Sequence, residues 1–128
     1  MIVGIGIDLV EVERMRLLLE RKGTRALERL FTAGERDYAR THPDPMRQLA
    51  ARVAAKEAAY KALSGNDLAR AIGWRELEVV SRKGHGPTLV LHGRARSRAD
   101  ELEVFQVHLS ITHTDLMAAA YVVAERAG

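Results

Sequence analysis

The stretch RVAAKEAAYKAL, residues 52–63, combines five alanines with four charged side chains. In a helix, at about 100° per residue, the alanines fall on one side. The other side carries Arg52, Lys56, Glu57, Tyr60 and Lys61. Because alanine has little bulk, its side lets the helix axis approach a sheet closely. The sequence therefore predicts a helix that packs through its alanines and directs its charges elsewhere.

The natural partner of this helix is a strand at the N-terminus, IVGIGID, residues 2–8. Its alternation places branched aliphatic residues on one face and Gly4, Gly6 and Asp8 on the other. Two glycines leave room for the alanine side of the helix, so Asp8 and Glu57 should meet at one rim. Lys61, one helical turn after Glu57, should stand beside them.

Two carboxylates brought together repel each other unless a cation or a shared proton relieves them. Asp8 and Glu57 therefore predict a site for a hard divalent cation with oxygen ligands and several waters. A plainer interpretation stays open, because Glu57 and Lys61 also form an ordinary i, i+4 pair worth only about 0.2–0.5 kcal/mol. In that case Asp8 simply ends its strand.

Helical signals fill the rest of the first half. Periodicity runs over residues 12–30, and Gly23 should divide this stretch into two short helices. Thr32 and Glu35 have the spacing of a capping box, and the helix that they open should end at His42 and Pro43. Asp44 with Pro45 should open the longest helix, which continues to Leu63.

The second half is mostly strand. The pattern predicts strands at 77–82, 87–92, 104–112 and 117–124, and a short helix at 94–102. One strand, several helices and then more strands predict an α+β fold, with helices packed on one side of a mainly antiparallel sheet. No linker or repeat divides the chain, so we expect one domain, residues 1–128.

Composition excludes several classes of protein. The absence of cysteine excludes disulfides, thiolate zinc sites and a cysteine nucleophile, and no signal peptide or membrane-length apolar run is present, so we expect a cytoplasmic protein without membrane contact. The net charge of +3, with sixteen arginines among twenty basic residues, favours an anionic partner, although a GC-rich genome has the same effect. Few aromatic residues and no recognisable module argue against nucleic acid, and the P-loop and G-x-S-x-G motifs are absent.

Residues 107–114, VHLSITHT, form a second polar group. Strand alternation places His108, Ser110 and Thr112 on one face, and a solvated sheet face would give the same pattern. His108 and His113 are five residues apart, hence on opposite faces, and make poor joint zinc ligands.

Four blocks together resemble the bacterial holo-acyl-carrier-protein synthases, the small class of 4′-phosphopantetheinyl transferases. The blocks are GIGIDLVEVERM at 4–15, FTAGERDYA at 31–39, RVAAKEAAYKAL at 52–63 and HLSITHT at 108–114. The resemblance implies the 4′-phosphopantetheinyl transferase fold. It also implies transfer of phosphopantetheine from coenzyme A to a serine of apo acyl carrier protein, with Mg²⁺ and release of adenosine 3′,5′-bisphosphate.

The same resemblance suggests roles for individual residues. Asp8 and Glu57 resemble the family's metal ligands, and Lys61 resembles its active-site lysine. The coenzyme A contacts that it implies are Arg52, Lys61, Ser64, Gly65, Pro87, His108 and Thr112. Where the family has a Gly-Thr-Gly turn close to the pyrophosphate, this chain has Ser64, Gly65 and Asn66, which puts the loop contacts in doubt.

The first helical stretch fits a carrier-protein surface. Arg14, Leu18, Arg21 and Arg25 fall near one stripe, continued by Arg29, if the axis runs on across Gly23. A basic stripe with an apolar anchor suits an acidic helical partner such as acyl carrier protein. A solvated arginine face remains the alternative.

One layer of helices leaves the other face of the sheet uncovered. The C-terminal strands are rich in apolar residues, namely Val104, Phe105, Met117 and Val122, so copies of the chain should cover that face. The resemblance implies a homotrimer with active sites between subunits, in which His108 serves the Asp8 and Glu57 of a neighbour.

Two other classes of function remain open from the residues alone. One is a magnesium phosphohydrolase acting on coenzyme A or a nucleotide. The other is a non-catalytic module that binds an acidic protein or nucleic acid. The module would not need Asp8, Glu57 and Lys61 in one place, and the hydrolase would need no acceptor protein.

Overall fold

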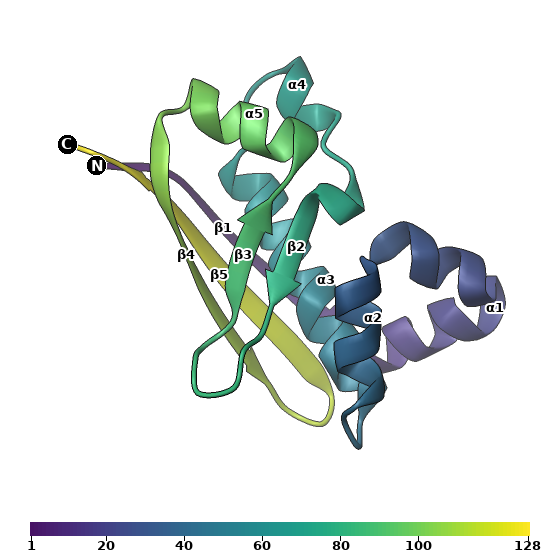
Figure 1. Ribbon diagram of the computed structural model, residues 1–128. Coiled ribbons are helices and arrows are strands. Elements are labelled where there is room, and N and C mark those ends of the chain that lie inside the picture. Colours follow the sequence, from purple (N-terminus) through teal and green to yellow (C-terminus); the bar gives the residue numbers. More distant parts are fainter.

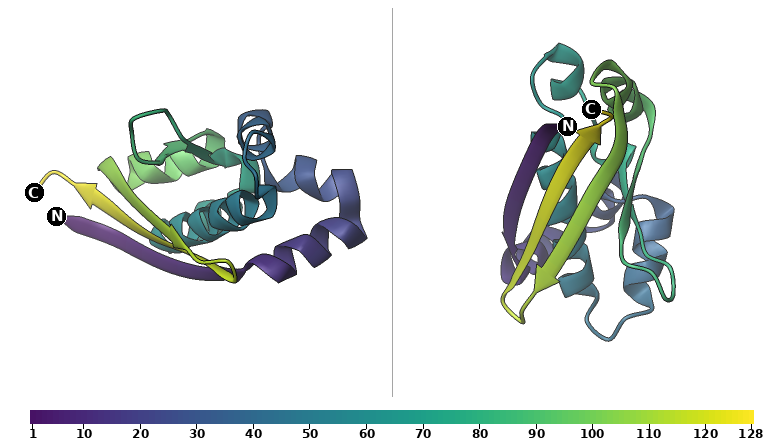
Figure 2. Two further views of the ribbon diagram at one scale, coloured as in Figure 1. Left: turned by 90° about the horizontal axis from the view of Figure 1, so that it is seen from below. Right: turned by 90° about the vertical axis from the view of Figure 1, so that its left-hand side faces the viewer.

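A long central helix, α3 (Pro45–Ala62), packs on a three-stranded sheet in the computed structural model, which describes residues 1–128 (Figure 1). The sheet has the order β1 (Ile2–Glu11), β5 (Met117–Arg126) and β4 (Val104–His113), with both pairs antiparallel. Figure 2 shows the helices gathered on one side of this sheet. The predicted class, helices on one side of an antiparallel sheet, is confirmed.

The predicted contact between glycines and alanines positions α3. A Cβ atom at Gly4 would overlap the carbonyl oxygen of Ala62, and one at Gly6 would overlap that of Ala58. The helix therefore lies closer to β1 than larger residues at these two positions would permit. At the start of α3, Asp44 caps the helix by accepting a hydrogen bond from the Arg47 backbone N–H at 3.2 Å.

A second layer covers the other side of α3. It contains α2 (Ala33–Arg40), the 3₁₀ turn η1 (Trp74–Glu76), and a separate two-stranded sheet of β2 (Leu77–Val80) and β3 (Thr88–Leu91). The helices α4 (Asp67–Arg70) and α5 (Gly93–Glu101) lie together beyond the C-terminal end of α3 (Figure 1). The strands 77–82 and 87–92 thus form a hairpin of their own instead of joining the main sheet.

This second layer buries two of the charges that α3 carries. Arg52 is 2% exposed and Lys56 is 0% exposed. The Lys56 ammonium donates to Glu35 Oε1 at 2.7 Å, to the Trp74 carbonyl at 2.9 Å and to the Leu77 carbonyl at 2.7 Å. All three of its protons are satisfied, as a buried ammonium requires.

Glu35 completes the connection between the layers. Its Oε2 accepts from the Val79 backbone N–H at 2.9 Å, and its Oε1 accepts from the Thr32 N–H at 2.9 Å. The predicted capping box of Thr32 and Glu35 is confirmed. The carboxylate therefore caps α2 and, through Lys56, also joins α2, α3 and the β2 hairpin.

Helix α1 (Val12–Leu30) is broken at Gly23, which has φ 63° and ψ −146°. The predicted division into two helical segments is confirmed, and Figure 1 shows the bend. The single stripe from Arg14 to Arg29 is wrong, because the axis does not continue across Gly23. Arg25 and Arg29 lie on the second segment instead.

The face of the three-stranded sheet away from α3 is largely apolar and exposed. Its exposed large residues include Ile5, Ile7, Leu9, Phe105 and Tyr121. Of the C-terminal residues expected there, Val122 is instead buried in the core, and Val104 packs against the core. Positions 117 and 122 are an odd number apart, so strand alternation cannot place both on one face. No helix is long and apolar enough to cross a bilayer.

The fit between β1 and α3 makes Gly6→Ala a direct test. The added methyl would collide with the α3 backbone, which cannot move as a side chain can, so we expect a loss of at least about 2 kcal/mol in the free energy of unfolding. Urea unfolding measures it. Gly86→Ala is the control, because nothing lies within 4 Å of that position. Equal stability of the two variants would contradict the close approach.

Candidate active site

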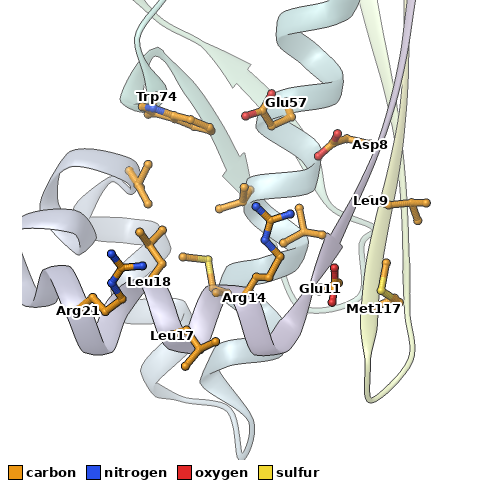
Figure 3. A pocket seen from close by; sticks show the side chains of 14 residues that line it. Asp8, Leu9, Glu11, Arg14, Leu17, Leu18, Arg21, Glu57, Trp74 and Met117 are labelled. Atoms are coloured by element: carbon orange, nitrogen blue, oxygen red, sulfur yellow. The ribbon is translucent and has the colours of Figure 1, made fainter.

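Two carboxylates and an ammonium group converge where β1 passes α3. Asp8 and Glu57 point into the same groove in Figure 3. Lys61 Nζ donates to Asp8 Oδ1 at 3.1 Å and to the Ile7 carbonyl at 2.9 Å. The predicted meeting of the three side chains is confirmed. This meeting depends on the close contact of Gly6 with Ala58. Glu57 directly precedes Ala58, and Lys61 lies one helical turn after Glu57, so both side chains are held near Asp8.

The electrostatics of the site are those of a carboxylate pair whose repulsion one ammonium group relieves only in part. Burial raises the pKa of Glu57, and the negative charge of Asp8 raises it further, while Lys61 lowers it. Lys61 thus opposes the repulsion, but the net direction is upward. A second positive charge beside the two carboxylates would stabilise their ionised forms.

The donor set suits Mg²⁺ that also binds a substrate. Asp8 and Glu57 are two carboxylates, and no third His, Cys, Asp or Glu side chain joins them in a group that could hold a metal ion. Mg²⁺ commonly keeps several waters and binds one or two carboxylates together with substrate phosphates. The two carboxylates therefore fit this ion when substrate supplies further oxygens.

A groove of about 750 Å³ leads from the carboxylates to α1. Arg14, Leu18 and Arg21 line it together with Asp8 and Glu57 (Figure 3). Three of the four predicted docking residues therefore border the same groove as the carboxylates.

Arg25, the fourth predicted docking residue, lies beyond the break at Gly23. It lines a neighbouring groove of about 740 Å³, which it shares with Leu18, Arg21 and Arg29. The predicted row of arginines is thus divided between two neighbouring grooves, and Leu18 and Arg21 border both.

Trp74 is a site residue that the sequence analysis missed. It borders both grooves and a third cavity of about 280 Å³ that reaches Glu57 and Tyr60. Figure 3 shows its ring across the groove from Arg14 and Arg21. The available signal in the sequence is that Trp74 is the only tryptophan and lies three residues before β2. Lys56 fixes the Trp74 main chain through its carbonyl.

Within one chain, His108 and Thr112 stand apart from this site. They lie on the exposed face of β4, opposite the residues that pack on the core. His108 Nε2 lies 2.9 Å from Glu125 Oε1 on β5. Pro87 lies directly before β3, on the hairpin. These three predicted coenzyme A contacts do not line the groove of Asp8 and Glu57.

Arg52 is near the site in sequence but has other partners. Its guanidinium lies 4.2 Å from the centre of the Tyr38 ring, and Nη2 donates to Ser81 Oγ at 3.1 Å. Its Nε is buried without a hydrogen-bond partner, which leaves one donor unused. Arg52 is therefore buried beneath α2 and the β2 hairpin and does not line the groove of Asp8 and Glu57.

The turn that departs from the family pattern follows α3 directly. Ser64 Oγ donates to the Lys61 carbonyl at 2.7 Å, and Gly65 has a φ of 132°. A residue with a side chain rarely adopts such a φ, so Gly65 is needed for the turn itself. Ser64 and Gly65 thus lie next to Lys61, as expected.

Comparison with known proteins agrees with the geometry. The 4′-phosphopantetheinyl transferase superfamily matches residues 4–124. The holo-[acyl-carrier-protein] synthase of Alkalilimnicola ehrlichii is 48% identical over 126 residues, which cover 98% of this chain and 98% of that protein. Crystal structures of relatives extend the match to the whole fold.

The holo-[acyl-carrier-protein] synthase of Neisseria meningitidis has a TM-score of 0.86 at 27% identity, covering 98% of this chain and all of that one. The Bacillus anthracis synthase, in complex with CoA (3′,5′-ADP), has a TM-score of 0.79 at 33% identity and covers 99% of both chains. The sequence and the fold both match, and this chain therefore belongs to the holo-[acyl-carrier-protein] synthases of the 4′-phosphopantetheinyl transferase superfamily.

Proposed function

We propose that the chain moves the 4′-phosphopantetheine group of coenzyme A to a serine of apo acyl carrier protein and releases adenosine 3′,5′-bisphosphate. The observation that carries this proposal is one groove that has Asp8 and Glu57 at one end and Arg14, Leu18 and Arg21 of α1 at the other. Lys61 is bonded to Asp8 beside this groove. A relative from Helicobacter pylori is known in complex with coenzyme A, which supports the donor. A phosphohydrolase would need no such helix beside its carboxylates.

The chemistry assigned to this chain's residues follows from their positions. Asp8 and Glu57 would hold Mg²⁺, which supplies charge neutralisation for the pyrophosphate oxygens when it is bound. Glu57 points into the groove that leads to α1, so we assign to it the proton of the carrier serine. The serine oxygen forms a bond to the β-phosphorus, and the bond from that phosphorus to the bisphosphate oxygen breaks.

Lys61 is assigned to the leaving group. Its ammonium is held by Asp8 and the Ile7 carbonyl but remains about half exposed, so it has a proton free for a substrate oxygen. A fixed positive charge at the departing bisphosphate stabilises the transition state more than the ground state. Ser64 and Gly65, on the turn after Lys61, are proposed to contact coenzyme A at the same end of α3.

An assay with coenzyme A, Mg²⁺ and apo carrier protein tests the proposed function, with the mass of the carrier as the readout. We expect the wild-type chain to add one phosphopantetheine. Glu57→Gln keeps the shape and removes a charge, so turnover should fall at least about a hundredfold. Hydrolysis of coenzyme A without transfer would indicate the phosphohydrolase, and binding without either reaction would indicate the non-catalytic module. Near-normal turnover of Glu57→Gln at saturating Mg²⁺ would remove Glu57 from the site.

The two grooves beside α1 are the surface that we assign to the carrier protein. Arg14, Arg21 and Arg25 supply positive charge, and Leu18 supplies an apolar contact between them. Such a surface complements an acidic helix. Because Arg14 and Arg21 share a groove with Glu57, a carrier held there would have its serine near the carboxylates.

Reversing two of these charges separates docking from chemistry. In Arg14→Glu with Arg21→Glu, we expect the KM for carrier protein to rise at least about tenfold and the association rate to fall, while coenzyme A affinity is retained. The control is Arg40→Glu with Arg96→Glu, which changes the net charge equally on exposed surfaces outside both grooves. An equal loss of coenzyme A affinity in the first variant would show that the surface serves the donor instead.

The exposed apolar face of the sheet supports assembly. We propose that this face forms the interface of a homotrimer, in which neighbouring chains cover Ile5, Ile7 and Leu9. His108 and Thr112 lie on the same face of the sheet, so a second chain placed there would meet them. His108, Thr112 and Pro87 are then proposed as coenzyme A contacts at a site between chains.

Light scattering should give three times the chain mass of 14.2 kDa. Mixing inactive His108→Ala chains with inactive Glu57→Gln chains should restore part of the activity, because some sites in mixed trimers would receive both intact residues. Each variant alone, taken through the same mixing procedure, is the control. A fully active monomer would refute the trimer, and failed complementation in confirmed mixed trimers would place both residues in one subunit.

A further inference from the structure

Arg98 is a nearly buried cation that the proposed chemistry does not use. It lies on α5, with a side chain 11% exposed, and its guanidinium reaches the end of α3. Nε donates to the Leu63 carbonyl at 2.8 Å, and Nη2 donates to the Ser64 carbonyl at 3.0 Å. Carbonyls at a helix C-terminus lack intrahelical partners, so one side chain here satisfies two of them.

Glu101 joins Arg98 to the far side of the same turn. Arg98 Nη1 donates to Glu101 Oε1 at 3.1 Å, and Asn66 Nδ2 donates to the same oxygen at 2.9 Å. These hydrogen bonds lower the pKa of Glu101, that from Asn66 most, and keep its carboxylate charged. Asn66 Oδ1 in turn accepts from the Ala69 N–H at 2.9 Å and caps α4. The turn is thus held at the Leu63, Ser64 and Asn66 positions.

Gly65 is the residue between these anchors. A Cβ atom at this position would lie 3.0 Å from Arg98 Nη2, so the guanidinium occupies the space that a side chain would need. The backbone N–H groups of Gly65 and Asn66 make no hydrogen bond within the chain. The Lys61 carbonyl lies at the start of this turn, where it accepts a hydrogen bond from Ser64 Oγ. Two successive backbone N–H groups without a partner suit a phosphate oxygen.

We infer that Arg98 is a positioning residue for coenzyme A, and this inference rests on the proposed function. Arg98 fixes the turn so that the N–H groups of Gly65 and Asn66 face a phosphate of the donor, while Arg98 itself touches no substrate. Arg98 meets these partners with Nε, Nη1 and Nη2, a planar spread of donors that the single Nζ of lysine does not reproduce. Asn66, which stands where the family has glycine, ties the turn to Glu101.

The test measures coenzyme A affinity by calorimetry, together with KM for each substrate, in Arg98→Gln and Arg98→Lys. We expect both variants to weaken coenzyme A binding and raise its KM about tenfold or more, because misplacement by about 1 Å is costly. The KM for carrier protein should change less than twofold. Arg96→Gln is the control, since Arg96 is an exposed arginine on the same helix that pairs only with Asp100.

Asn66→Ala provides a second route should Arg98→Gln fold poorly, because Asn66 is on the turn and its amide bonds Glu101. Its loss of coenzyme A affinity should be smaller than that of Arg98→Gln, and the double variant should lose less than the product of the two. Variants that melt earlier but bind coenzyme A normally would overturn the inference and leave the proposed function intact. A wild-type chain that binds coenzyme A but transfers nothing would overturn the proposed function alone, since affinity still reports on the turn.

Discussion

Glycine on β1 and alanine on α3 bring two backbones together without side chains between them. This contact fixes the depth at which α3 lies on the sheet, because a Cβ at Gly4 or Gly6 would collide with its carbonyl oxygens. It also sets the position of Glu57 and Lys61 relative to Asp8. The packing of the core and the geometry of the site are therefore one constraint, and close-packed interiors transmit any change from one to the other.

The buried pair of Lys56 and Glu35 performs a similar task on the opposite side of α3. Removing one partner of such a pair usually costs about 3–5 kcal/mol, because the other charge is left uncompensated. The pair holds the Trp74 and Leu77 carbonyls, so it positions the wall of the groove that faces Glu57. Adjacent residues of one helix thus support opposite requirements, since Lys56 must be dry and Glu57 must reach substrate.

Local patterns were enough to predict most elements, the glycine and alanine contact, and the meeting of Asp8, Glu57 and Lys61. The burial of Arg52 and Lys56 could not be predicted, because Glu35 is 21 positions from Lys56 and only the tertiary fold brings it near. Arg98 gave no signal either, since its carbonyl partners carry no side-chain identity. The break of α1 was expected at Gly23, but the direction of the bend depends on packing, so the division of the predicted arginine stripe between two grooves could not be predicted.

In the proposed trimer, the bare apolar face of the three-stranded sheet would couple the stability of this chain to its concentration. Whatever covers Ile5, Ile7 and Leu9 binds the folded chain and not the unfolded one, so it stabilises folding by mass action. On dilution that contribution fades, and water meets a row of aliphatic side chains on an edge strand, which is also where strands of other chains can add. The concentration of the chain in the cell would then set the stability of the folded chain as well as the total rate of the reaction.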